Sequence, residues 1–578
     1  MKKTATVKGI NGTVVKAVGF SIMGEMVHIG EKKLLGEVVE ISKYIIIQVF
    51  EDTTGLKEGD EIFGTGSPLS LTLGPGLMGG VFDGMGRNLK YRGEFLDVGI
   101  FKDITNKWKL DILVKEGDEI LENTTVAVIS ETSLIKHYIM SPFSGKVSSI
   151  NFQEEYDKSD TLLLLETKKS IREIKLQITW PVKIPRPTKN KEELKIPLIT
   201  GQRVIDSLFP IALGGTAAIP GGFGTGKTMT MHQIAKYAHA DILIYIGCGE
   251  RGNEIKGILD DFEKLKDPKT NNSLMEKTII IANTSNMPVS SREASIYTGV
   301  TIAEYYRDMG YNVVLIADST SRFAEGLREL SGRLREMPAE EGYPAYLSAR
   351  LANFYERAGF FKNLNGSYGS ITIMGTVSPQ GGDMNDTVTL NTKRYVRCFW
   401  ELDRALAYSR HFPAINYLNS YSEYVEDFNE WYIKNSSSDF LKNREKLINI
   451  LISQKKLEDI VKLIGEDVLH DSQKLVLIIG EIIKKGFLSQ NALSKKDSYT
   501  SLEIQNKFVQ IILYLYERAS SLVDMYIPVS IMKKQGIFTK IMNMKESDYT
   551  YSIDLNYYFN DIDSFYNKLA QEYEQVWQ

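Results

Sequence analysis

A glycine-rich loop that ends in lysine and threonine constrains this chain more than any other feature of its sequence. Residues 221–228 read GGFGTGKT and follow the apolar run GGTAAIP. Backbone N–H groups can surround a phosphate only where side chains leave room, and a helix N-terminus favours an anion. The pattern G-x-x-x-x-G-K-[ST] therefore predicts a strand, a phosphate-binding loop and a helix, within a mainly parallel sheet covered by helices.

We expect the whole loop to bind the phosphates of ATP or ADP. Its residues are Gly221, Gly222, Phe223, Gly224, Thr225, Gly226, Lys227 and Thr228. Lys227 would reach the β- and γ-phosphates, and the Thr228 hydroxyl would ligate Mg²⁺. The alternative for such a pattern is a glycine turn with no ligand. The helical spacing of Met231, Ile234, Ala235 and Ala238 directly after the loop counts against that alternative.

Two acidic residues that follow apolar runs are candidates to complete the site. The run VVLIAD ends at Asp318, where a carboxylate would hold Mg²⁺ through water. The stretch YIGCGERGNE places Glu250 and Arg251 just past another predicted strand. A carboxylate at the carboxyl edge of a parallel sheet can orient an attacking water. Taken alone, Glu250 is better explained as a solvated loop residue.

The length of 578 residues predicts a multidomain chain. Short apolar runs broken by glycine predict an N-terminal β-barrel over residues 1–70, followed by a connector over 71–99. Residues 100–185 read as a β-rich insertion, similar in architecture to the barrel of biotin- or lipoyl-carrying domains. Residues 186–430 would form a RecA-like α/β nucleotide-binding domain, and 431–578 a helical domain.

Three local features give further expectations. Residues 180–197 contain four prolines and several lysines, which predicts an exposed linker. Ser290 and Glu293 have the spacing of a capping box at the start of a helix that ends at Gly310. The final residues, DSFYNKLAQEYEQVWQ, predict a terminal amphipathic helix.

Composition excludes several classes of protein. A net charge of −4 and a pI of about 6.1 give no basic footprint for nucleic acid. The two cysteines cannot form a disulfide framework, and Cys248 reads as a small packed residue. No apolar run approaches the length of about 18 residues that a membrane span needs, so any membrane contact would come through partners.

Several stretches together resemble the catalytic A (alpha) subunit of V-type and archaeal-type rotary ATPases, in a prokaryotic form. They are PGGFGTGKT, YIGCGERGNE, the run from LIADSTSRFAEG to FYERAG, and RHFPAINYLNSYS. The resemblance covers essentially the whole chain, and the 100–185 insertion is similar to the bulge domain of that subunit. It implies that Glu250 polarises the attacking water, that Arg251 lies near the γ-phosphate, and that Phe412 stacks on adenine.

The resemblance also implies partners. Three A subunits would alternate with three B (beta) subunits in an A3B3 ring around central stalk subunits, with peripheral stalk subunits outside. The B subunit would supply an arginine to the nucleotide. The ring would lie on the cytoplasmic face of a membrane, most simply the plasma membrane, and couple ATP turnover to H⁺ or Na⁺ transport in a membrane sector.

Three departures from the family pattern stand near the expected site. Gly222 replaces a usual proline and should make the loop more flexible. Gln380 and the step Asn385-Asp386-Thr387 replace a second proline and a Glu-Pro step, so coupling between subunits could differ. Thr225 stands where some relatives have cysteine, which excludes a disulfide within the loop.

Three other classes share parts of this pattern. A RecA-like hexameric helicase or transcription terminator would need a basic, aromatic-rich RNA-binding domain. A secretion-system ATPase has the same order of barrel, core and helices but a shorter chain without the insertion. A nucleotide-binding scaffold without activity would not need Glu250.

Overall fold

The structure is a computed structural model that describes residues 2–89, 99, 106–267, 270–546 and 555–577. Residues 90–98 and 100–105, where the connector was predicted to meet the insertion, lie outside the described residues. The chain forms two compact units. Unit 1 comprises residues 1–193, 213–216 and 240–396, and unit 2 comprises 194–212, 217–239 and 397–578.

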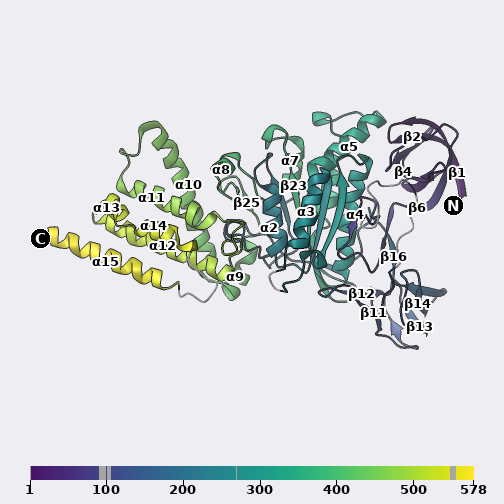
Figure 1. Cartoon of the computed structure of the whole chain (residues 1–578), viewed down its shortest axis with the longest axis horizontal. Helices are drawn as coiled ribbons and strands as arrows, with labels where there is room; N and C mark the ends of the chain where they lie inside the picture. The colour runs from purple at the N-terminus through teal and green to yellow at the C-terminus, as the bar shows by residue number, and fades with distance from the viewer. Residues whose placement is uncertain (1, 90–98, 100–105, 268–269, 547–554, 578) are drawn as a thin grey trace. The chain divides into compact units, whose positions relative to one another are not determined.

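Unit 1 begins with a closed six-stranded barrel in the order β1-β2-β5-β4-β3-β6 (Figure 1). Its strands are β1 (Lys2–Asn11), β2 (Val14–Gly19), β3 (Glu25–Ile29), β4 (Leu34–Ile41), β5 (Ile45–Val49) and β6 (Glu61–Pro68). Small β-branched side chains such as Val15, Val27 and Ile47 fill its interior. This confirms the barrel that the short apolar runs predicted.

The insertion folds into two small antiparallel sheets around one core. One sheet has the order β10 (Glu119–Ile120), β13 (Gly145–Ile150), β14 (Thr161–Glu166), β15 (Ile171–Lys175), and the other β12 (Lys136–Met140), β11 (Thr125–Ser130), β9 (Asp111–Ile112). Val126, Leu163 and Leu165 lie in that core. A buried cluster ties the insertion to helix α4 (Ser290–Asp308), because His137 contacts Glu131 at 2.8 Å and the Tyr305 hydroxyl at 2.8 Å.

The α/β part of unit 1 is built on a parallel sheet. Its strands, in spatial order, are β23 (Tyr368–Val377), β21 (Asn312–Asp318), β19 (Ile242–Glu250), β20 (Thr278–Thr284) and β8 (Val81–Phe82). The helices that follow β19, β20 and β21 are α3 (Gly252–Lys264), α4 and α5 (Thr320–Leu334). The strands are continuous apolar runs because they are buried on both faces. The predicted α/β class is thus confirmed.

Helix α4 confirms one prediction and corrects another. A helix begins with the sequence SSREAS, as expected. The capping box does not form, because Ser290 is already the first helical residue and its hydroxyl donates to the Val49 carbonyl of the barrel. A tertiary contact has therefore taken the side chain that the sequence pattern assigned to a local cap.

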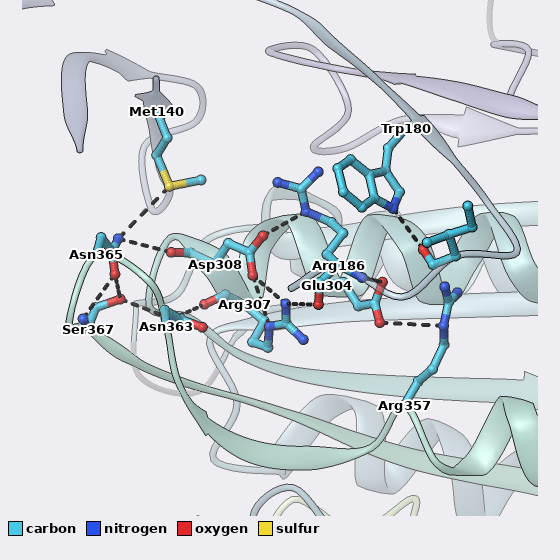
Figure 2. A network of polar contacts seen from close by, with 11 residues as sticks. Met140, Trp180, Arg186, Glu304, Arg307, Asp308, Arg357, Asn363, Asn365 and Ser367 are labelled. Carbon is cyan, nitrogen blue, oxygen red and sulfur yellow. Dashed lines mark hydrogen bonds and ion pairs between the residues drawn. The ribbon is translucent and has the colours of Figure 1, made fainter. Parts of the chain in front are cut away.

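The predicted linker over residues 180–197 is only partly exposed. Val182 and Arg186 are buried, and Arg186 forms an ion pair with Asp308 at 2.6 Å (Figure 2). The Arg186 N–H donates to Glu304 at 3.0 Å, and Arg357 donates to the Val182 carbonyl at 2.9 Å. The prolines keep this segment extended, but its backbone groups and arginine find partners on α4, so it is anchored.

Unit 2 begins around a short strand arrangement. β18 (Thr216–Pro220) pairs in parallel with β24 (Cys398–Phe399), which pairs with β25 (Tyr421–Ser422). Helix α1 (Arg203–Leu208) precedes β18, and helix α2 (Lys227–Tyr237) follows it. Met231, Ile234, Ala235 and Ala238 are all buried, as their helical spacing predicted.

The rest of unit 2 is helical, as predicted (Figure 1). Its helices are α8 (Arg404–Tyr408), α9 (Asn429–Asn435), α10 (Phe440–Ile464), α11 (Asp471–Glu481), the π-helix η5 (Ile482–Leu488), α12 (Leu502–Asp524), α13 (Val529–Lys534), α14 (Ile537–Met542) and α15 (Tyr557–Trp577). The terminal helix α15 packs on α12, and its side chains Tyr558, Ile562, Tyr566 and Leu569 are buried. Within the described part of the chain, no helix is both long and apolar enough to span a membrane.

Candidate functional site

The glycine-rich loop lies between β18 and α2 in unit 2. Gly224 and Gly226 have φ angles of +77° and +87°, a region that side chains disfavour, so glycine is required there. The N-cap residue of α2 is Gly226, which has no side chain to cap the helix. The first amide groups of α2 are therefore available to an anion, as the sequence motif predicted.

The polar side chains of the loop bond to the loop's own backbone. Lys227 Nζ donates to the Gly221 carbonyl at 2.6 Å, and the Thr225 hydroxyl to the Gly222 carbonyl at 2.8 Å. Thr228 lies in the first turn of α2, and the Phe223 side chain is 90% exposed. The lysine thus lies folded over the loop, with its ammonium group where a phosphate could replace a carbonyl as its acceptor.

Gly222, one of the departures from the family pattern, faces the guanidinium group of Arg404. A Cβ atom at this position would lie 2.7 Å from Arg404 Nε, and Arg404 is exposed. Because Arg404 is a flexible side chain, it could move aside, so glycine is not a steric requirement here. Because Gly222 has no side chain, the guanidinium group of Arg404 can lie against the loop.

Phe412 lies in the same unit as the loop and close to it. A Cβ atom at Gly226 would lie 3.3 Å from Phe412 Cε1, and the Phe412 side chain is 39% exposed. The peptide bond between Phe412 and Pro413 is cis. The structure therefore brings together two of the predicted elements, the loop and the aromatic ring, with the ring partly open to solvent.

The predicted carboxylates lie in unit 1, at the carboxyl edge of its parallel sheet. Glu250 is the last residue of β19, and Asp318, the last residue of β21, pairs in register with Gly247. Burial, the negative charge of Asp318 and a contact with Glu254 raise the pKa of Glu250 to about 8, while Arg322 opposes this. Glu250 is thus a partly buried carboxyl in an acidic cluster, and not a solvated loop residue.

Asp318 is held by two hydroxyl groups. Tyr245 donates to one carboxylate oxygen at 2.8 Å, and Thr376 donates to the other at 2.6 Å. The buried hydroxyl of the adjacent Ser319 has no hydrogen-bond partner among the residues that the structure describes. The free lone pairs of Asp318 and this hydroxyl fit a hydrated divalent cation, for which carboxylates and water are the usual ligands.

The remaining predicted residues are either exposed to solvent or have structural roles. Arg251 is exposed and begins helix α3 as its N-cap residue. Cys248 is buried, as expected for a packed residue, and burial raises its pKa to about 12. Among the family departures, Asp386 caps helix α7 (Thr387–Lys393) by accepting from the Thr389 N–H, which is a local structural role.

Sequence reasoning missed the groups that support these carboxylates. Tyr245 lies within YIGCGERGNE and Arg322 within LIADSTSRFAEG, but neither motif assigns them this role, and Thr376 lies outside the quoted stretches. Each of the three comes from a different element of unit 1. One signal was present in the sequence, the tyrosine of ILIYIG. Its hydroxyl group lies within an otherwise aliphatic strand, and a buried hydroxyl needs a hydrogen-bond partner.

Four family models match the chain and define its class. The ATP synthase alpha/beta family nucleotide-binding domain matches residues 201–422, and the beta-barrel domain of that family matches 7–66. The alpha/beta subunit barrel-sandwich domain matches 102–183, and the C-terminal domain of V and A type ATP synthase matches 429–529. The fold and the loop are thus those of a P-loop protein of the ATP synthase alpha/beta class.

The chain belongs to the family of V-type and A-type ATP synthase alpha chains. It is 51% identical to V-type ATP synthase alpha chain 2 of Clostridium tetani, over 99% of this chain and 98% of the relative. It is 49% identical to the V-type ATP synthase alpha chain of Halothermothrix orenii, over 100% of both chains. The V-type ATP synthase alpha chain of a Thermoanaerobacter species is 47% identical, over 93% of each chain.

A solved structure shares the fold at lower similarity. The assembled ATPase EscN of the enteropathogenic E. coli type III secretion system is 22% identical, with a TM-score of 0.66 over 88% of this chain and 99% of that chain. This likeness concerns the fold alone. The relatives at about half identity favour the rotary class over the secretion-system, helicase and scaffold alternatives.

Proposed function

We propose that this chain is the catalytic subunit of a V/A-type rotary ATP synthase, which couples MgATP hydrolysis or synthesis to H⁺ or Na⁺ transport across a membrane. The observation that supports this most is Glu250. In a chain related over its full length to V-type alpha chains, this strand-end carboxyl combines partial burial with a raised pKa. A general base works best when its pKa lies near the working pH.

The residues of unit 2 bind the nucleotide in this proposal. The N–H groups of Gly221, Gly222, Phe223, Gly224, Thr225 and Gly226 surround the phosphates, and Lys227 turns from the Gly221 carbonyl to the β- and γ-phosphates. Thr228 holds the metal ion, and Phe412 stacks on adenine. This assignment is supported by the loop geometry and by the ring of Phe412 over Gly226.

The residues of unit 1 act on the reacting phosphate. Glu250 accepts a proton from the attacking water, Arg251 neutralises charge that develops on the γ-phosphoryl group, and Asp318 holds metal-bound water. Mg²⁺, when bound with ATP, neutralises the charge of the β- and γ-phosphates. In synthesis the same residues act in the reverse direction.

The proposed partners follow from the family. A B (beta) subunit completes each nucleotide site in an A3B3 ring, central and peripheral stalk subunits contact that ring, and the membrane sector lies on the far side of the stalks. We place the ring on the cytoplasmic face of the plasma membrane and propose no nucleic-acid partner. A partner arginine contributes about 10³–10⁵ in rate in other P-loop enzymes, so the isolated chain should turn over slowly.

The test is Mg²⁺-dependent ATP hydrolysis by the complex isolated from its source cells, in wild type and in Glu250→Gln. We expect the variant to bind ATP normally and to lose at least about 10²-fold in rate, since it keeps its size but cannot take a proton. Mass spectrometry should find a partner chain of similar size in equal amount. Equal turnover by both forms, or the absence of that partner, would overturn the proposal.

A further inference from the structure

Segment 487–500 comprises the last two residues of the π-helix η5 and the connection to α12, and it contains several buried polar side chains. Gln490, Asp497, Ser498 and Thr500 are all buried there. A buried polar segment must find hydrogen-bond partners inside the protein. In unit 2 these partners lie on the elements that precede and follow the phosphate-binding loop.

Arg203, the first residue of α1, locks the segment in place. Its side chain is fully buried and donates to the Ser489 carbonyl at 2.7 Å and to the Thr500 hydroxyl at 3.0 Å. Its charge is balanced by Asp497, 2.7 Å away. Breaking such a buried, paired charge is strongly unfavourable, so the segment and α1 move together.

The far end of the loop helix also contacts this segment. The hydroxyl of Tyr237, the last residue of α2, lies 2.7 Å from that of Ser498, and its ring packs against Tyr499 at 5.3 Å between ring centroids. The Gln202 side chain donates to the Ser498 carbonyl at 3.0 Å. The segment is thus fixed to α2 and to the residue that precedes α1.

Gln490 connects this fixed segment to Phe412. Its backbone N–H donates to the Phe412 carbonyl at 2.7 Å. Its side-chain oxygen accepts from the Arg203 N–H at 2.9 Å, and its side-chain nitrogen donates to the Gly201 carbonyl at 2.9 Å. Because both ends of the side-chain amide are bonded, the backbone of Gln490 is restrained, and its N–H restrains the carbonyl of Phe412 in turn.

We propose that Gln490 is a positioning residue for the adenine ring. It holds the backbone of Phe412 so that the phenyl ring lies over Gly226, and it ties that ring to the helical domain. The proposal rests on the assignment of Phe412 to adenine made above. It adds that binding of the adenine base, and not of the phosphates, restrains segment 487–500.

The test compares two ligands on the purified full chain. ATP meets both the loop and Phe412, whereas inorganic tripolyphosphate meets the loop alone. Calorimetric titration of Gln490→Ala should show ATP affinity reduced about 5- to 20-fold, the size of a lost stacking interaction, and tripolyphosphate affinity within about twofold of wild type. Gln454→Ala is the matched control, because Gln454 is equally buried, on α10, and donates to the Leu477 carbonyl.

Phe412→Ala separates this inference from the one on which it rests. If Phe412→Ala binds ATP as wild type does, the adenine assignment itself fails. If Phe412→Ala weakens ATP binding but Gln490→Ala does not, the adenine assignment stands and the positioning role is wrong. Equal losses for ATP and tripolyphosphate in Gln490→Ala would mean general damage to the fold and would also overturn the positioning role.

A second variant and a second readout cover the case in which Gln490→Ala does not fold. Gln490→Glu keeps an acceptor for the Arg203 N–H, replaces the donor to Gly201 with a second acceptor and adds a negative charge, so it should show a loss of the same kind, larger for ATP than for tripolyphosphate. In wild type, ATP should slow hydrogen exchange in segment 487–500 more than tripolyphosphate does. The same protection by both ligands would contradict the proposal.

Discussion

The phosphate-binding loop of unit 2 and the carboxylates of unit 1 use different parts of the chain for their chemistry. In the proposed function the loop acts through backbone groups, with glycines at positive φ and a glycine, Gly226, as the N-cap residue of α2. The carboxylates work through side chains, which strand ends present and which Tyr245, Thr376 and Arg322 support. The backbone groups of the loop form one continuous sequence motif, whereas the side chains that support the carboxylates come from three separate elements, and no single motif identifies them as a group.

The largest effect is expected at Lys227, the loop side chain that we propose to contact the β- and γ-phosphates. Lys227→Ala should weaken ATP binding by about 2–4 kcal/mol, or about 30- to 1,000-fold, because a charge-assisted contact to phosphate is lost. Calorimetric titration of the purified chain measures this. Lys236→Ala, at the other end of α2 with its ammonium over the Tyr237 ring, is the control and should bind normally. Unchanged ATP binding in Lys227→Ala would remove the loop from the site.

A methyl group tests the backbone itself. Gly226→Ala places a side chain at φ +87° and 3.3 Å from the Phe412 ring, so it should cost about 1–2 kcal/mol and about 10-fold in ATP affinity. Gly257→Ala in α3 is the control, because in the described structure a Cβ atom there meets open space. That change should leave binding alone and raise stability slightly. Comparable ATP affinities in the two variants would refute the geometric argument.

Removing a hydroxyl group that bonds to Asp318 should have a smaller effect, and on the Mg²⁺ requirement of ATP binding. Tyr245→Phe removes one donor to Asp318, so about 1 kcal/mol should be lost and the Mg²⁺ concentration needed for half-maximal ATP binding should rise about 3- to 10-fold. ATP binding without Mg²⁺ should not change. Tyr311→Phe, which loses a bond to the Lys136 carbonyl, serves as the control. An unaltered Mg²⁺ requirement would show that Tyr245 has no part in holding Asp318 for the metal.

The smallest effect at neutral pH concerns His411, next to Phe412. Burial, together with the charges of Lys484 and Lys545, lowers the pKa of His411 from 6.5 to about 4. A lowered pKa for a histidine means that the folded state favours its neutral form. The stability of the fold is therefore unaffected by His411 above pH 6.5 and falls as the pH falls from 6.5 towards 4. Thermal unfolding should show a loss on the order of 1–3 kcal/mol over that range. His411→Gln should flatten the profile, and an unchanged slope in that variant would assign the loss to other groups.

The fold class was predictable because apolar periodicity and glycine punctuation report local structure directly. The barrel, the strands before Glu250 and Asp318, and the helical C-terminal domain all follow from runs of a few residues. The division into residues 1–70, 71–99, 100–185, 186–430 and 431–578 stays a prediction, as do the roles of the site residues.

The failures have a common cause in long-range contacts. Ser290 was assigned to a helix cap, but its hydroxyl bonds to Val49, 241 positions away. Arg186 was assigned to an exposed linker, but it pairs with Asp308, 122 positions away. Tyr245 reaches Asp318 across 73 positions. Pairings of this kind depend on which strands become neighbours, and a local pattern carries no information about that.

The anchored exit of the insertion has a mechanical consequence. A few residues after the last strand of the insertion, the Val182 carbonyl accepts from Thr301 of α4 and from Arg357. Arg186 bonds to Glu304 and Asp308 of α4 (Figure 2). A flexible linker would extend under a force on the insertion and would not transmit that force. Here a force on the insertion is transmitted directly to Glu304 and Asp308 of α4. Since α4 packs against the central strands of unit 1, a displacement of the insertion would displace this helix.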